Sequence, residues 1–241
     1  MTAETIKKQL KIEKIIQETP DTKTIRLKLE KPMDFAPGQF VMLGLDLDID
    51  GEKKLVKRAY SIASSPTKKD YLELTFNIYP KGQLSPHLYA LKEGDNLYVE
   101  GPFGKFNFKE DNSRRAIFIG AGAGLTPLMS MIRYCADKKL PAKSTLIYSV
   151  KKPENIIYYK ELLEIEKSKK LDLNITITRP EGTNWKGRTG RIDSNMITEL
   201  LSPILEQSNF YLCGPPEMVE GTVKILEELC VGKDRINREQ W

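Results

Sequence analysis

Two short segments of the sequence combine residue types that could hold a phosphorylated aromatic ligand. The first, Arg58-Ala59-Tyr60-Ser61, offers a guanidinium fork that suits a phosphate, a ring that can stack, and a hydroxyl that can donate a hydrogen bond. The second, Gly120-Ala121-Gly122-Ala123-Gly124, is a glycine-rich turn whose backbone can approach a pyrophosphate closely. What these segments can do depends on the elements that position them.

The glycine-rich turn follows a buried-strand pattern at 116–119 and precedes a helical pattern that starts near Pro127. Amide hydrogens and the start of a helix favour negative charge at such a junction. Thr126 is expected to cap the helix, and Pro127 suits its first turn because proline has no amide hydrogen. The glycine spacing departs from the usual dinucleotide fingerprint. A tight turn that needs small residues only for packing is therefore an alternative interpretation.

The first hundred residues have the pattern of short strands separated by turns. Apolar residues alternate with polar ones over 24–29 and again over 71–78, so each strand is expected to present one face to a core. Turn signals lie at Ala36-Pro37-Gly38 and Glu93-Gly94-Asp95. This pattern predicts an antiparallel β-barrel or sandwich.

Strand and helix patterns alternate after a polar stretch at 109–115. The strand patterns lie at 116–119, 145–150, 173–178 and 210–213, and the later helical patterns at 158–167, 194–201 and 217–229. Such alternation predicts a parallel sheet with helices on both faces. We therefore expect an N-terminal antiparallel β-barrel over 1–110 and a C-terminal α/β parallel-sheet nucleotide-binding domain over 111–241.

The composition argues against several other classes of protein. The 241 residues are 40% hydrophobic and 29% charged, as in ordinary globular proteins. A net charge of +5 does not indicate nucleic-acid binding, although it could steer an acidic partner. No export signal is expected, because residues 1–10 are polar and lysine-rich without an apolar core, and no membrane span is expected, because nowhere do eighteen apolar residues run together. Three cysteines are too few for a disulfide framework or a metal site, so a reducing cytoplasm is the expected setting.

The segment at 58–61, followed by Ile62-Ala63-Ser64-Ser65, resembles the flavin-binding motif of the ferredoxin-NADP reductase family. Four further segments resemble, in the family's order, its phosphate-binding turn, its barrel-end signature, its dinucleotide loop and its nicotinamide-side loop: Gly82-Gln83-Leu84-Ser85, Gly101-Pro102-Phe103-Gly104, residues 120–127, and Cys213-Gly214-Pro215-Pro216. The match spans nearly the whole chain. The resemblance implies FAD in the barrel domain and NADP(H) or NAD(H) in the α/β domain.

The resemblance also implies which residues touch the cofactors. Arg58 and the turn at 82–85 would hold the flavin pyrophosphate, Tyr60 would lie against the isoalloxazine, and Ser61 would hydrogen-bond its N5 edge. The full expected set of cofactor-binding residues is Arg58, Ala59, Tyr60, Ser61, Asn77, Ile78, Tyr79, Gly82, Gln83, Leu84, Ser85, Gly122, Gly124, Thr126, Pro127, Lys151, Thr178, Arg179, Cys213, Gly214, Pro215 and Trp241.

The expected catalytic residues are Ser61, Cys213 and Glu239. Many members of the family end in an aromatic ring that covers the flavin, and Trp241 is expected to be such a lid. Glu239 would then lie near the N5 edge and assist proton exchange with Ser61. For Cys213, the alternative to a nicotinamide contact is a small buried residue at a strand end.

Basic residues at the ends of the second and third strands of the α/β domain favour NADPH. Lys151 and Thr178-Arg179 could donate to a 2'-phosphate, with Lys186 or Arg188 nearby. Arg179-Pro180 followed by Trp185 also resembles NADH-using members, so both nucleotides stay open.

The predicted function is that of a flavin-dependent oxidoreductase. It would transfer a hydride between NAD(P)H and bound FAD, and single electrons to or from a separate carrier. The expected partner is an acidic redox protein such as ferredoxin or flavodoxin, because opposite charges steer association. The alternatives are a free-flavin reductase and a non-catalytic electron-transfer subunit of a larger redox complex.

Overall fold

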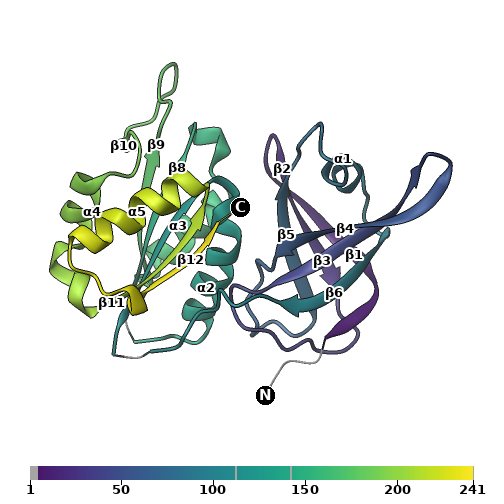
Figure 1. Cartoon of the computed structure of the whole chain (residues 1–241), viewed down its shortest axis with the longest axis horizontal. Helices are drawn as coiled ribbons and strands as arrows, with labels where there is room; N and C mark the ends of the chain where they lie inside the picture. The colour runs from purple at the N-terminus through teal and green to yellow at the C-terminus, as the bar shows by residue number, and fades with distance from the viewer. Residues whose placement is uncertain (1–4, 112, 142, 241) are drawn as a thin grey trace.

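Two six-stranded sheets lie side by side in the computed structural model (Figure 1). The structure describes residues 5–111, 113–141 and 143–240. One sheet belongs to the N-terminal half of the chain and the other to the C-terminal half.

The N-terminal sheet is antiparallel and has the strand order β4-β3-β6-β1-β2-β5. Its strands are β1 (Ile6–Thr19), β2 (Thr22–Lys28), β3 (Phe40–Ile49), β4 (Glu52–Ser61), β5 (Tyr71–Asn77) and β6 (Asn96–Phe103), with the short helix α1 (Ser85–Tyr89) between β5 and β6. An antiparallel bridge between Ile62 and Leu74 joins the end of β4 to β5, so the two outer strands meet. Leu27, Leu43 and Leu72 are fully buried inside. The predicted β-barrel is confirmed.

The C-terminal sheet is parallel and has the order β10-β9-β8-β7-β11-β12. Its strands are β7 (Arg115–Ala121), β8 (Ser144–Val150), β9 (Leu171–Ile177), β10 (Arg188–Thr189), β11 (Ser208–Gly214) and β12 (Ile236–Gln240). The helices are α2 (Leu125–Asp137), α3 (Tyr159–Lys167), α4 (Ser194–Leu201) and α5 (Pro216–Glu228).

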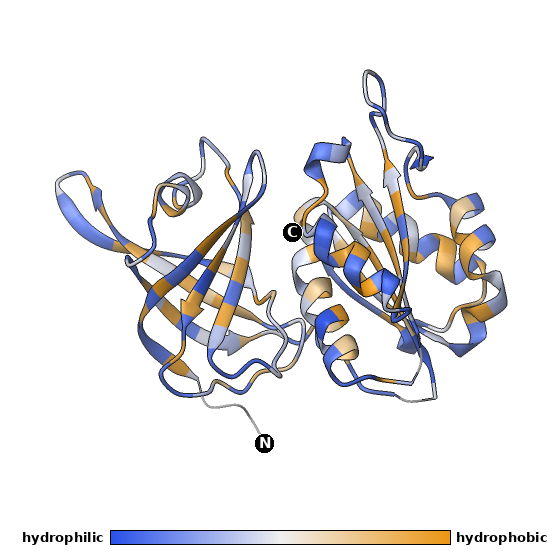
Figure 2. Cartoon of the chain, turned by 180° about the vertical axis from the view of Figure 1, so that it is seen from behind, coloured by the Kyte–Doolittle hydropathy of each residue, from blue (hydrophilic) through white to orange (hydrophobic). Residues whose placement is uncertain are grey.

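Apolar side chains pack on both faces of this parallel sheet. Leu128 of α2 and Leu162 of α3 belong to one buried cluster, whereas Ile197 of α4 and Val219 of α5 belong to another. Figure 2 shows the apolar residues gathered in the central strands, while the tip of the β3–β4 hairpin is largely hydrophilic. The predicted parallel sheet with helices on both faces is confirmed.

The strand order places the glycine-rich turn where ligands bind in sheets of this kind. The chain moves from β7 outward to β8 in one direction and later returns to β11 on the other side of β7. Loops after these strands then diverge and leave a crevice at the carboxyl ends. The turn at 120–124 closes β7 at that point.

Strand β5 presents its apolar face to the barrel core, as predicted, and its polar face is buried as well. Glu73 and Thr75 lie on its polar face, yet they are only 3% and 4% exposed. The C-terminal half covers this face, since Arg133 of α2 contacts Glu73 and Tyr158, just before α3, contacts Thr75. The contact between the two halves therefore buries a face of β5 that is polar in sequence.

The helices of the described residues are short. The longest, α2 and α5, have 13 residues each, and none within the described ranges is long and apolar enough to cross a membrane.

Candidate cofactor-binding site

A pocket of about 350 Å³ opens on the barrel beside the end of β4; we call it the barrel pocket. The predicted residues that line it are Arg58, Ala59, Tyr60, Ser61, Asn77, Tyr79, Gly82, Gln83, Leu84, Ser85 and Thr126. Thr75, Phe76 and Ala123 complete its walls and were not predicted. The motifs at 58–61 and 82–85, about twenty residues apart in sequence, thus line the same pocket. Thr126 of the C-terminal half lines it as well.

Arg58 connects the two predicted phosphate anchors. The pairing of β3 with β4 sets Arg58 opposite Leu43. Its Nη2 donates to Gln83 Oε1 at 2.5 Å, and its Nη1 donates to the Lys57 carbonyl at 2.8 Å. A guanidinium carries five N–H donors, so these contacts leave capacity for a phosphate at the same place.

The turn after β5 is held by Ser85. The Ser85 hydroxyl accepts from the Tyr79 amide at 3.0 Å and donates to the Tyr79 carbonyl at 3.1 Å. A Cβ at Gly82 would lie 2.7 Å from Ser85 Oγ, so glycine is the residue that leaves this turn undisturbed. The turn therefore has a fixed shape against the barrel pocket.

Tyr60 and Ser61 line the barrel pocket from the end of β4. The Tyr60 ring packs edge-on against Phe76, with ring centroids 5.7 Å apart. Burial raises the pKa of Tyr60 to about 12, so its phenol stays protonated at neutral pH and can donate a hydrogen bond. Ser61, the last residue of β4, adds a second hydroxyl.

Thr126 indicates whether the lining of the barrel pocket fits a polar ligand. It is 3% exposed, and within the described part of the chain its Oγ1 has no hydrogen-bond partner. The prediction that Thr126 caps the helix was wrong: α2 begins at Leu125 after Gly124, with no side-chain capping bond. A buried hydroxyl without a partner is costly. A polar group of a ligand in this pocket would satisfy it, which fits a bound flavin.

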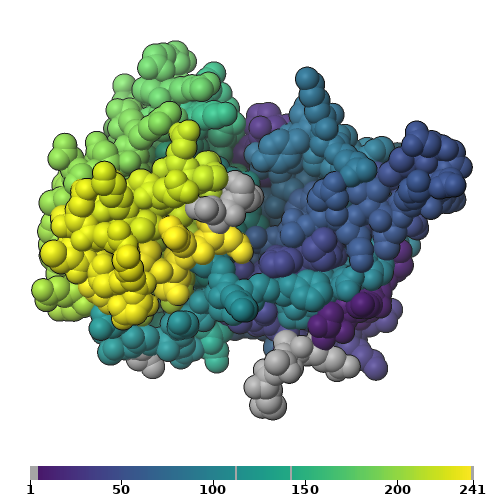
Figure 3. All heavy atoms as spheres, in the orientation of Figure 1, coloured from purple at the N-terminus to yellow at the C-terminus, as the bar shows by residue number. Residues whose placement is uncertain are grey.

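A second pocket, of about 670 Å³, lies along the seam between the two halves; we call it the seam pocket. Figure 3 shows this region as a hollow between the blue atoms of the barrel and the green and yellow atoms of the C-terminal half. The predicted residues that line it are Asn77, Tyr79, Gly122, Lys151, Thr178 and Pro215. Asn77, Tyr79 and Ala123 line both pockets, so ligands in the two would meet there.

Other residues of the seam pocket were not predicted. They are Asp21, Thr22, Ala121, Ala123, Ser149, Val150, Asn155 and Ile157. Asp21 and Thr22 reach it because the register of β2 and β5 sets Thr22 opposite Asn77, and the Thr22 hydroxyl hydrogen-bonds Asn77 Oδ1 at 3.1 Å. No local sequence signal marks such a long-range pairing.

The glycines of the turn have different roles. Gly122 has a φ of +54° in the left-handed region, faces open space and lines the seam pocket. Gly124 is buried, and a Cβ there would lie 2.2 Å from the Cys213 carbonyl oxygen. The packing interpretation therefore holds for Gly124, whereas Gly122 has the place and freedom of a ligand-binding residue.

Several predicted residues lie outside the linings of the two pockets. Cys213 is 4% exposed within the core cluster, and burial raises the pKa of its thiol. Glu239 is paired beside it on β12, and burial raises the pKa of that carboxyl. The others are Ile78, Gly124, Pro127, Arg179 and Gly214. Trp241 lies outside the described residues.

Comparisons with known proteins match both halves of the chain. An oxidoreductase FAD-binding domain model matches residues 9–108, and an oxidoreductase NAD-binding domain model matches residues 118–224. The chain is a ferredoxin reductase-type flavoprotein oxidoreductase. The reductase binds FAD and a pyridine nucleotide.

The reductase is similar to components of oxygenase systems. It is 34% identical over 219 residues to the glycine betaine monooxygenase reductase subunit of Pseudomonas aeruginosa, covering 89% of this chain and 58% of that protein. The solved ferredoxin reductase in carbazole 1,9a-dioxygenase is 27% identical, with a TM-score of 0.87 over 100% of this chain and 70% of that one.

A third comparison shows the fold alone. The ferredoxin NADP+ reductase of Neisseria gonorrhoeae is 22% identical, with a TM-score of 0.80 over 97% of this chain and 98% of that one. The reductase thus corresponds to the whole length of that protein but to little more than half of the glycine betaine relative.

Replacement of Arg58 is expected to weaken FAD binding much more than riboflavin binding. Arg58→Ala removes the charged donor at the barrel pocket, and hydrogen bonds to charged groups contribute about 1.5–3 kcal/mol each. We expect the dissociation constant for FAD to rise at least about tenfold. Riboflavin, which has no phosphate, should bind as before. Fluorescence titration of the cofactor-free protein measures both constants.

The control for this prediction is Lys54→Ala, which removes an exposed cation from the same β3–β4 hairpin. It should leave both constants unchanged. An equal loss of FAD and riboflavin affinity in Arg58→Ala would show that Arg58 does not act on the phosphates.

Proposed function

We propose that this reductase oxidises a reduced pyridine nucleotide at the seam pocket, reduces FAD in the barrel pocket, and delivers single electrons to a separate redox protein. The observation that carries this proposal is the shared wall of the two pockets. Asn77, Tyr79 and Ala123 border both, so the reactive ends of two ligands would meet there. Bound FAD supplies the chemistry that converts a two-electron hydride transfer into single-electron steps.

The side chains of the two pockets bind and orient the cofactors. Arg58 and the turn at 82–85 hold the phosphates, while the Tyr60 phenol and the Thr126 hydroxyl orient the polar edge of the ring system. Ser61 is the hydroxyl that we assign to the N5 edge. Cys213 and Glu239 lie together at the ends of β11 and β12, where the Glu239 carboxyl could exchange protons with that region.

Two basic residues, Lys151 and Arg179, follow the carboxyl ends of β8 and β9. Lys151 lines the seam pocket, and its carbonyl accepts from the Arg179 amide at 2.8 Å, which brings the two side chains to the same edge of the sheet. Two cations favour the 2'-phosphate of NADPH. An acidic ferredoxin or flavodoxin is the electron carrier that suits the net charge of +5. The oxygenase reductases among the relatives support a carrier protein as the acceptor.

Anaerobic reduction tests the function directly. The FAD-loaded protein is mixed with NADH or NADPH without oxygen, and the visible flavin absorbance is followed. We expect bleaching with NADPH at lower concentration than with NADH, followed by recovery when oxidised ferredoxin or flavodoxin is added.

Each other outcome has a defined meaning. If neither nucleotide bleaches the flavin, the proposed function is wrong. If FAD is lost readily and added riboflavin is turned over, the protein is a free-flavin reductase. If bleaching is slow in the isolated protein and rapid only with a co-purified partner, it is a subunit of a larger redox complex.

A further inference from the structure

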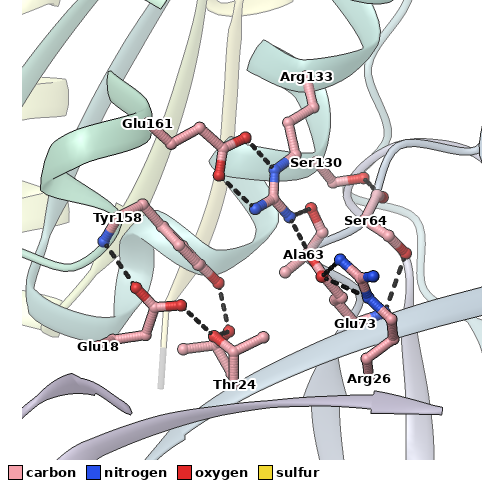
Figure 4. Close-up of polar contacts among 11 residues, drawn as sticks. Glu18, Thr24, Arg26, Ala63, Ser64, Glu73, Ser130, Arg133, Tyr158 and Glu161 are labelled. Carbon is pink, nitrogen blue, oxygen red and sulfur yellow. Dashed lines mark hydrogen bonds and ion pairs between the residues drawn. The ribbon is translucent and has the colours of Figure 1, made fainter. Parts of the chain in front are cut away.

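A pair of buried hydroxyls joins the two halves of the reductase between its two pockets. Tyr158, which precedes α3, is 4% exposed, and its phenol hydrogen-bonds the hydroxyl of Thr75 on β5. Thr75 in turn shares a 2.6 Å hydrogen bond with Thr24 of β2. Figure 4 shows the Tyr158 ring pointing from the C-terminal half toward Thr24 on the barrel.

The backbone of Tyr158 is held by the barrel as well. Its amide donates to Glu18 Oε2 at 3.2 Å, and Glu18 Oε1 accepts from Thr24 Oγ1 at 2.8 Å (Figure 4). Tyr158 has a φ of +55°, in the left-handed region that residues with a Cβ rarely adopt. Strained backbone persists where the surrounding structure fixes it. The barrel therefore fixes both ends of this residue.

The hydrogen bond between Tyr158 and Thr75 joins segments that line different pockets. Thr75 lines the barrel pocket, and Ile157, next to Tyr158 in the chain, lines the seam pocket. The Tyr148 hydroxyl of β8 donates to the Gly122 carbonyl at 3.0 Å, so the glycine turn is anchored to the same half as Ile157. The hydrogen bond between Tyr158 and Thr75 thus links the wall of the barrel pocket to the wall of the seam pocket.

We propose that Tyr158 is a positioning residue for hydride transfer, because its hydroxyl bond to Thr75 sets the separation of the nicotinamide from the flavin. This inference rests on the proposed function. In the step concerned, the C4–H bond of the reduced nicotinamide breaks and an N5–H bond forms on the flavin. The nucleotide loses two electrons and the flavin gains two. A displacement of about 1 Å can cost about a hundredfold in such a step.

Other contacts keep the halves together when this hydroxyl is removed. Arg133 of α2 donates to the Ala63 carbonyl at 2.9 Å and to Glu73 at 2.7 Å, and the Ser130 hydroxyl donates to the Ser64 carbonyl at 2.7 Å. None of these five residues lines the barrel pocket or the seam pocket. The Tyr158→Phe variant should therefore fold with its two halves in contact and lose only the hydrogen bond to Thr75.

The test compares Tyr158→Phe with Tyr211→Phe. Tyr211 is also buried, at 1% exposure; its hydroxyl accepts from the Lys109 amide at 3.1 Å, and it lines neither pocket. In Tyr158→Phe, the rate constant of flavin reduction at saturating nucleotide should fall about tenfold or more. The apparent dissociation constant of the nucleotide should change less than about twofold, and the long-wavelength charge-transfer absorbance of nicotinamide over flavin should be lost.

Hydrogen–deuterium exchange of the cofactor-free protein supplies a readout that does not depend on activity. Amides of β5 and of residues 156–158 should exchange about tenfold faster in Tyr158→Phe, as expected for a lost hydrogen bond, and not in Tyr211→Phe.

Four results decide the inference. Slower reduction, lost charge-transfer absorbance and faster exchange, all confined to Tyr158→Phe, support it. Reduction within about twofold of the unmodified protein overturns it, as does an equal loss in Tyr211→Phe. Unmodified protein that neither nucleotide reduces overturns the proposed function instead, and the exchange data then still show whether Tyr158 ties the two walls.

Discussion

Gly124→Ala is expected to abolish nucleotide-dependent reduction while leaving FAD bound. A Cβ at this position would lie 2.2 Å from the Cys213 carbonyl oxygen, 2.6 Å from its carbon and 2.8 Å from Gly214 Cα. These are backbone atoms of β11, so no side-chain rotation can relieve the overlap. The loops after β7 and β11 must separate, which displaces the seam pocket. Stopped-flow absorbance should show flavin reduction slowed by at least about a hundredfold.

The expected effect of Gly124→Ala is steric overlap and not backbone strain. Its φ of −61° and ψ of −12° are helical and suit alanine, so backbone strain is not involved. Gly221→Ala in α5 is the matched control, since a Cβ there meets nothing within 4 Å and alanine favours helix. It should keep the normal reduction rate. Gly124→Ala protein that is reduced at the normal rate would disprove the close packing of these loops.

Glu73→Ala is expected to lower the free energy of unfolding by about 3 kcal/mol, as for removal of one partner of a buried ion pair. Glu73 is 3% exposed and accepts from Arg26 at 2.8 Å and from Arg133 at 2.7 Å (Figure 4). Without Glu73, the guanidinium of Arg133 keeps Glu161 and the Ala63 carbonyl as hydrogen-bond partners. Denaturant unfolding followed by tryptophan fluorescence measures the loss.

An exposed ion pair provides the control. Glu199→Ala removes the partner of Arg188 on the surface of the C-terminal half, where water replaces the lost contact. The unfolding midpoint should hardly move. If Glu73→Ala shifted the midpoint as little as Glu199→Ala, the interface network would have no measurable role in stability.

The fold class could be predicted because its signals are local. The period of two over 24–29, each single strand or helix pattern after 109–115, and the glycine turn can all be recognised within a short contiguous segment. The residues of the barrel pocket at 58–61 and 82–85 were accessible for the same reason, since each motif is a contiguous segment with its own turn or strand chemistry.

Other features depend on contacts between distant segments. Asp21 and Ile157 reach the seam pocket only through strand register and the approach of the two halves, so nothing around them in sequence indicates it. Thr126 resembles a helix cap in sequence, yet the helix starts before it and the residue lines the barrel pocket. The alternative for Cys213, a small buried residue at a strand end, describes where the structure places it.

The buried charges between the halves limit how this protein can be recombined with others. Glu73 belongs to the barrel, whereas Arg133 belongs to the nucleotide half, and each is desolvated against the other. A chimera that takes its barrel from another reductase would present Arg133 to a foreign surface without the Glu73 carboxylate, and only Glu161 of its own half would still pair with it among the described residues. A working chimera therefore requires that Glu73, Thr75 and their neighbours on β5 are transferred together with the C-terminal half. The segment to be exchanged thus includes residues from both domains.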